Sequence, residues 1–274
     1  MSRRVALVVI GSLTSLMACS AGSHPAAPSP ASRSVRAAPS PSPSPSPSPS
    51  PVTLPLAGRT IVIDPGHNGG NAAAASVINQ LVPAGGFEKP CDTAGTETDD
   101  GYPEYAFTLD VAQRAAVLLR REGARVVLTR TTSSGVGPCV DVRAAIGNEA
   151  HAAAAISIHA DGGPASGTGF HVIEPALAPD RGNAAIIAPS QRLALDVRAA
   201  FLESTAEPYA NYVAQQGLIA RDDLGGLNLS RVPKVFIECA NMRGAADALR
   251  VKDPAWREKA AEGIADGLSR YLRS

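Results

Sequence analysis

The sequence lacks an excess of charge of either sign. Its 274 residues include 25 Lys and Arg against 25 Asp and Glu, so the formal net charge at pH 7 is zero. Binding to nucleic acid or to anionic membranes depends on clustered positive charge, so we expect neither kind of partner from this balance. The sequence also offers no comfortable transmembrane helix at its N-terminus. The apolar stretch there, residues 5–16, is too short to span a membrane comfortably.

The N-terminus instead has the pattern of an export signal. Two arginines precede the apolar stretch, and small residues follow it. The end of this stretch, LMAC, resembles a bacterial lipobox, which predicts a lipoprotein-type signal peptide over residues 1–19 with a lipid on Cys19. An ordinary signal peptide cut near Ala18 or Ala21 is the alternative. Both predict an exported protein of the periplasm or cell wall, and a lipid would anchor it at the outer face of the cytoplasmic membrane.

Residues 20–53 are almost entirely Ala, Ser and Pro and include the repeat PSPSPSPSPSPSP. Such a segment has too few apolar side chains to offset the entropy lost on ordering, so we expect a disordered linker. Its alternating prolines favour an extended spacer that reaches on the order of 100 Å. The remaining residues, 54–274, are enough for one catalytic domain with a substantial core.

Cysteine is scarce, with four residues in the chain. Besides Cys19, Cys91 and Cys139 each follow a proline in polar, loop-like surroundings, and in an oxidising compartment they are the plausible disulfide pair. Cys239 lies in the apolar run KVFIECA and is expected to be a buried free thiol.

Apolar runs alternate with helical patterns through the domain, and there is no internal repeat. This order predicts a three-layer α/β fold with a mostly parallel, mixed central sheet flanked by helices. The polar segment 68–101 is expected to be an extended loop. Strands are predicted at residues 60–64, 125–129, 154–159, 169–174 and in VPKVFIECA, and helices from Pro103 to the stop at Gly123 and at 140–150, 187–205 and 254–272.

Three of the predicted strands end in a side chain that can do chemistry: His67, His159 and Glu238. A single histidine at a strand end is more often structural than a ligand, but several such ends converge on one crevice of an α/β sheet. Glu104 lies in the first turn of the helix after Pro103, where a cap is the ordinary explanation. Two histidines and one glutamate are also a ligand set of catalytic zinc sites, and Glu238 would then remain available as the base.

Four motifs carry a family resemblance. IVIDPGHNGG, EYAFTLDVA, ISIHAD and VPKVFIECANM resemble, in this order, the zinc-dependent N-acetylmuramoyl-L-alanine amidases of bacterial cell walls, over essentially all of residues 58–274. The resemblance implies that His67, Glu104 and His159 hold one zinc ion per chain. It implies that Glu238 is the catalytic glutamate, and Asn241 stands where members often have asparagine.

The reaction implied by the resemblance cleaves the amide between N-acetylmuramic acid and the L-alanine of the stem peptide, in cell-wall remodelling or turnover. The partner is therefore peptidoglycan or a muropeptide, and a membrane is contacted only through the predicted lipid anchor. The sequence indicates no oligomeric state. Asn68 and Asp161 depart from the common pattern of the family, but neither change removes a ligand.

Other side chains are weaker candidates. Asp64 is expected to cap its loop or to orient His67 rather than to bind metal. Glu97 would rival Glu104 as a ligand if the polar segment folded inward. Remaining expectations are an exposed His151, a structural His171, and a loop bearing Arg221 and Asp222 that touches substrate.

Two rival functions stay open at this stage. A non-catalytic module that binds wall glycan or regulates another hydrolase would lack a ligand or the base, whereas all four residues are present. Another zinc hydrolase, a peptidase or a deacetylase, would use the same ligand set on a different amide.

Overall fold

The computed structural model describes residues 53–274. The predicted signal peptide, the lipidation site Cys19 and the predicted linker up to residue 52 lie outside the described residues. None of the helices in residues 53–274 is long and apolar enough to cross a membrane.

A six-stranded sheet forms the centre of the domain, in the order β4-β1-β5-β8-β6-β7. Neighbouring strands run parallel except β6 and β8, which are antiparallel. The predicted mixed, mostly parallel sheet is therefore confirmed. The strands are β1 (Thr60–Pro65), β4 (Arg125–Leu128), β5 (Ala154–Asp161), β6 (His171–Pro175), β7 (Leu218–Arg221) and β8 (Lys234–Asn241).

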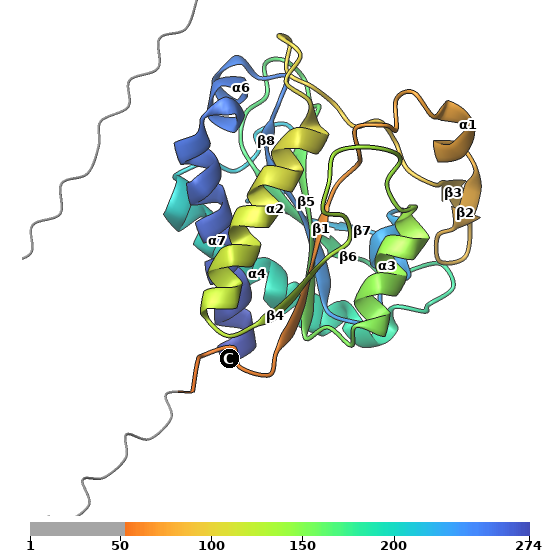
Figure 1. Ribbon diagram of the computed structural model, residues 1–274, viewed down its shortest axis with the longest axis vertical. Coiled ribbons are helices and arrows are strands. Elements are labelled where there is room, and N and C mark those ends of the chain that lie inside the picture. The colour runs from red at the N-terminus through yellow and green to blue at the C-terminus, as the bar shows by residue number, and fades with distance from the viewer. Residues whose placement is uncertain (1–52) are drawn as a thin grey trace, which may run out of the picture. The chain divides into compact units, whose positions relative to one another are not determined.

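Helices cover both faces of this sheet, which gives the three layers (Figure 1). One face packs against α2 (Glu104–Arg121), α4 (Ile187–Thr205) and α7 (Pro254–Arg273). The other carries α3 (Val140–Glu149), which contacts the short α5 (Gly225–Asn228). Successive side chains of a strand point to opposite faces, so Ile61 and Ile63 join the large core under α2 while Val62 joins the smaller cluster on the α3 side.

Helix α2 shows how the sequence pattern becomes packing. Phe107, Val111 and Ala115 recur at helical spacing and are fully buried, and Leu119 completes the buried stripe. Burial of a large apolar side chain contributes roughly 1.5–3 kcal/mol, so this face holds the helix on the sheet. The helix stops before Gly123, whose φ of 96° is left-handed. The helix thereby presents its first residue, Glu104, at the carboxyl edge of the sheet.

The structure contains several elements that the sequence pattern did not predict. The segment 68–101 is not a plain loop, because it forms α1 (Ala75–Ile78) and a hairpin of β2 (Leu81–Pro83) and β3 (Glu88–Pro90). The edge strand β7 has four residues with no fully buried side chain, so no apolar run marks it. Two further helical segments, a 3-10 turn at Ala184–Ile186 and α6 (Ala245–Lys252), complete the described elements.

The three cysteines within residues 53–274 behave as predicted. Cys91 and Cys139 form a disulfide, which joins the end of the hairpin to the residue that precedes α3. Cys239 is free and buried in β8. The disulfide closes a loop with a sequence separation of 48 residues between segments that share little core.

Candidate metal centre

The carboxyl ends of β1 and β5 and the first turn of α2 bring three side chains together. Nε2 of His67 lies 3.2 Å from Oε2 of Glu104, and Nδ1 of His159 lies 2.9 Å from Oε1 of the same carboxylate. One donor atom from each residue lies within 4.8 Å of the others. Two imidazole nitrogens and a carboxylate oxygen thus face a common point, which is the donor set of a catalytic zinc site.

The turn after β1 is built for close approach. A Cβ on Gly66 would lie 2.2 Å from Cε1 of His159, so only glycine leaves room for that ring. His67 follows with φ of 58°, a left-handed conformation that is uncommon for a residue with a side chain. The buried Arg130 holds the turn by donating from Nε to the carbonyl of Pro65 and from Nη2 to the carbonyl of Gly66.

The far nitrogen of His67 points away from this centre, into the segment after the disulfide. Nδ1 lies 3.1 Å from the carbonyl oxygen of Thr93 and 3.3 Å from Oδ1 of Asp92. Both partners accept hydrogen bonds, so Nδ1 carries a proton, and Nε2 is the nitrogen that would bind a metal. A metal at Nε2 would therefore leave the ring in the tautomer that a ligand needs.

The charges at this point favour a bound cation. Burial lowers the pKa of His67, but the carboxylates of Glu104 and Asp92 outweigh it and raise that pKa to about 10. Burial also raises the pKa of Glu104, yet the two imidazoles hold it well below its usual range. Without a metal the cluster thus keeps a proton as its positive charge, and the residues present fit a divalent ion.

Glu238 lies next to the three donors without belonging to them. In the sheet it is opposite His159 of β5 on one side and His171 of β6 on the other. Its Oε2 is buried and has no hydrogen-bond partner. Burial, followed by the nearby charges of Glu104 and Asp161, raises the pKa of Glu238 well above its usual value. A carboxyl with a raised pKa can hold a proton and pass it on, as a general acid–base does.

The expectation that Asp64 orients His67 is wrong. Asp64 is buried, and its carboxylate accepts hydrogen bonds from Thr129, Ser157 and Arg143 and pairs with Lys234. It thereby links the end of β1 to the middle of β5 and to the residue after β4. The carboxylate at Nδ1 of His67 belongs to Asp92, which sequence reasoning missed, and whose one signal was its place directly after Cys91.

The structure places the other candidate residues, Glu97, His151 and His171, outside the group of three donors. Glu97 forms an isolated bridge with Pro103 and is not part of the donor group, so it does not rival Glu104. His151 is exposed, as predicted. His171 is buried at the start of β6, and burial lowers its pKa to about 4.

Two asparagines of the motifs, Asn68 and Asn241, hold loops near the site by hydrogen bonds. Asn68 accepts from the backbone N–H of Gly69 and donates to the carbonyl of Ser134, so it ties the turn after His67 to a neighbouring loop. Asn241 donates to the carbonyls of Pro164 and Gly167 and holds the loop after β5 in place. Neither asparagine hydrogen-bonds to any of the three donor side chains.

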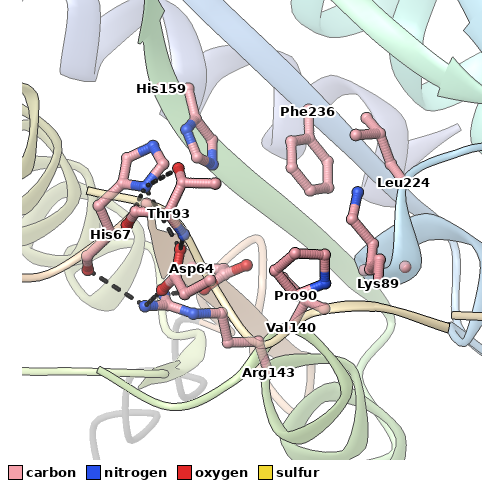
Figure 2. A pocket seen from close by; sticks show the side chains of 14 residues that line it. Asp64, His67, Lys89, Pro90, Thr93, Val140, Arg143, His159, Leu224 and Phe236 are labelled. Atoms are coloured by element: carbon pink, nitrogen blue, oxygen red, sulfur yellow. Dashed lines mark hydrogen bonds and ion pairs between the residues drawn. The ribbon is translucent and has the colours of Figure 1, made fainter. Parts of the chain in front are cut away.

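A groove runs past both imidazoles. On one side lies a cavity of about 180 Å³ walled by Phe236, Leu224, Val140 and Pro90, with Lys89 at its edge (Figure 2). Phe236 stacks on His159 with ring centroids 5.3 Å apart and an interplanar angle of 10°. On the other side is a polar recess lined by Glu238, Asp161 and Arg221 among others. Arg221 thus lies at the site, held by Asp223, whereas Asp222 does not line it.

Comparisons with known proteins agree with this geometry. Residues 61–270 match the family model Amidase_3, N-acetylmuramoyl-L-alanine amidase. The chain is 41% identical over 220 residues to the N-acetylmuramoyl-L-alanine amidase Rv3717 of Mycobacterium tuberculosis, an alignment that covers 79% of this chain and 88% of that protein.

Solved structures show the same similarity. The crystal structure of the N-acetylmuramyl-L-alanine amidase Ami1 from Mycobacterium smegmatis superposes with a TM-score of 0.74 at 41% identity, covering 79% of this chain and 98% of that one. The apo form of Ami1 from Mycobacterium abscessus superposes with a TM-score of 0.73 at 41% identity, covering 79% and 100%. The chain therefore belongs to the N-acetylmuramoyl-L-alanine amidase family.

Proposed function

We propose that this enzyme hydrolyses the amide between N-acetylmuramic acid and the L-alanine of the stem peptide by means of one zinc ion bound to His67, Glu104 and His159. Family membership supports the reaction. The observation that carries the site is the convergence of three donor atoms within 4.8 Å of one another, beside a glutamate that is not one of them. When bound, zinc supplies Lewis acidity toward the substrate carbonyl and activates a water molecule for attack.

The side chains around the centre have distinct roles in this proposal. Glu238 accepts a proton from the attacking water at its unpartnered Oε2 and delivers a proton to the leaving amine nitrogen. Phe236 fixes the plane of His159 by stacking on it. The apolar wall of the cavity excludes bulk water from one side, which strengthens every charge interaction at the reacting carbonyl.

Two cations near the centre suit an anionic, partly apolar substrate. Lys89 lines the apolar cavity and donates to the backbone carbonyl of Asp223, and Arg221 lines the polar recess and pairs with the carboxylate of the same residue. Stem peptides carry carboxylates, and these two cations would attract them without a basic protein overall.

Domain organisation belongs to the same proposal. Residues 1–19 export the protein, and lipidation of Cys19 would anchor it at the outer face of the cytoplasmic membrane. Residues 20–53 then act as a spacer, and residues 54–274 as the catalytic domain that reaches the wall. Peptidoglycan is the substrate expected for a cell-wall amidase.

Digestion of purified peptidoglycan tests the function directly. Mass spectrometry of the products should show stem peptides that begin with free L-alanine, and a chelator should abolish their release until zinc is restored. Cuts within the peptide would identify a peptidase instead, and loss of acetyl groups a deacetylase.

Glu238→Gln tests whether Glu238 transfers protons without binding zinc. The variant should bind zinc as the wild type does and lose turnover by 100-fold or more, of the order of the loss of a general acid–base. Glu149→Gln on the exposed end of α3 is the control and should keep full activity. Near-normal turnover of Glu238→Gln would remove Glu238 from the mechanism.

A further inference from the structure

The orientation of His67 depends on two chain segments that are remote in sequence. One is residues 91–93, which supply the acceptors at Nδ1: the carbonyl of Thr93 at 3.1 Å and Oδ1 of Asp92 at 3.3 Å. The hydroxyl of Thr93 lies 3.2 Å from the same nitrogen. No other segment of residues 53–274 contacts this nitrogen by hydrogen bond or ion pair.

The second segment holds the backbone of His67 through Arg143 of α3. Nη2 of Arg143 donates to the carbonyl of His67 and to Oδ2 of Asp92, both at 3.1 Å, and Nη1 donates to the carbonyl of Pro65 at 2.8 Å. Arg143 and Asp92 are both buried. One guanidinium therefore links the left-handed His67 to the carboxylate of Asp92, and Figure 2 shows Arg143 beside His67.

The Cys91–Cys139 disulfide joins these two segments. Cys91 directly precedes Asp92, and Cys139 is the N-terminal cap residue of α3, four residues before Arg143. A backbone hydrogen bond of 2.8 Å from Val140 to the carbonyl of Cys91 lies beside it. The residues that contact His67, Asp92 and Thr93 on one side and Arg143 on the other, thus all lie within four residues of a cysteine of this disulfide.

Packing alone holds this region weakly. Between residues 68 and 101 the buried apolar side chains are Ile78, Ala84 and Cys91, so the segment has almost no core of its own. A covalent cross-link stabilises such a loop by restricting its unfolded conformations.

From these contacts we propose that the disulfide clamps Asp92 and Thr93 against Nδ1 of His67, and that Asp92 is thereby a positioning residue of the metal centre. The inference rests on the proposed zinc site. A carboxylate that accepts from the far nitrogen of a ligand histidine fixes its tautomer, aims its lone pair and increases its basicity as a ligand. Loss of such a partner typically costs 10- to 100-fold in metal affinity.

Zinc affinity of the full catalytic domain, measured by competition with a chelating dye, tests the proposal. We expect Asp92→Asn to weaken zinc binding about 10- to 100-fold. The double variant Cys91→Ser, Cys139→Ser should weaken it by a similar factor, because the clamp is lost while Asp92 remains. Glu88→Gln, an exposed carboxylate in the same hairpin, is the matched control and should bind zinc as the wild type does.

A second readout separates positioning from general stability. Proton–nitrogen correlation spectra of the zinc-loaded protein report which ring nitrogen of His67 carries the proton and how fast that proton exchanges with water. The wild type should show a slowly exchanging Nδ1 proton, and both variants a faster one. Circular dichroism of each variant verifies that the domain is folded. If the double variant does not fold, Asp92→Asn still tests the proposal, because it retains the disulfide.

The proposal is overturned if either folded variant binds zinc with wild-type affinity and keeps the protected Nδ1 proton. Failure of the proposed function itself would look different, because the wild-type protein would then bind no zinc through His67.

Discussion

Replacement of Asp64 by Asn tests the buried charge cluster beneath the metal centre. Oδ1 of Asp64 accepts from Thr129 at 2.6 Å and from Arg143 at 2.8 Å, and Oδ2 accepts from Ser157 at 2.6 Å. Lys234 lies 3.4 Å from Oδ2, and Asp64 is its ion-pair partner within residues 53–274. Asn keeps the shape of Asp64 but removes the one negative charge that Lys234 contacts.

The cost follows from what remains after the change. Arg143 still contacts Asp92, but Lys234 is left as a buried ammonium with no counter-ion. Removing one partner of a buried pair costs about 3–5 kcal/mol. That is a large share of the roughly 5–15 kcal/mol by which domains are stable. For a domain of this size each kcal/mol lowers Tm by about 2–4 °C, so we expect a decrease of about 6–20 °C.

Urea unfolding of the metal-free protein near neutral pH measures this loss. Asp99→Asn is the matched control, because Asp99 is exposed and pairs with Arg243 at the surface, and it should change the free energy of unfolding by less than about 0.5 kcal/mol. The double variant Asp64→Asn, Lys234→Met should be more stable than Asp64→Asn alone, since the unpaired cation is gone.

The decrease in the free energy of unfolding at acidic pH gives an independent measure of the contribution of Asp64. Burial raises the pKa of Asp64, but Lys234 and Arg143 outweigh it and hold that pKa well below its usual range. The stability from this carboxylate is therefore present above about pH 4, the unfolded pKa, and is lost as the pH falls below it. Asp64→Asn should flatten this decline. A variant within about 1 kcal/mol of the wild type, with the same decrease at acidic pH, would refute the assignment of a strongly stabilising charge cluster.

Three further predictions follow from single contacts. Gly66→Ala should lower zinc affinity at least about tenfold by displacing the ring of His159, which equilibrium dialysis measures. Burial and then Asp247 raise the pKa of Glu207 to about 8, so urea titrations should show stability falling as the pH rises from about 5 to about 8, and Glu207→Gln should remove this slope. Asn241→Ala should cost about 1–3 kcal/mol, because the carbonyl of Gly167 loses its donor and the carbonyl of Pro164 keeps only the backbone N–H of Gly167; thermal unfolding would show this, and a loss under 0.5 kcal/mol would contradict it.

Much of the fold and the members of the site were predictable from local patterns. Apolar runs mark β1, β5 and β8 because buried strands of a mixed sheet are nearly continuous in hydrophobic residues. Since parallel strands end at one edge, His67 and His159 had to lie near each other once both were strand ends. The hairpin in 68–101 and the edge strand β7 left no such mark, because their side chains are mostly exposed or half-buried.

What the sequence by itself pointed to is therefore the set of residues that we propose for the chemistry, from strand ends, a helix start and four ordered motifs. The tertiary structure alone decided what orients them. Asp64 looked like the natural partner of His67 because it is three residues away, yet its carboxylate pairs with Arg143, 79 residues along the chain, and with Lys234, 170 residues along. The partner of His67 is Asp92, held by a disulfide to the start of α3. Which buried charge meets which depends on chain segments that meet only after folding, and no periodicity within one segment records it.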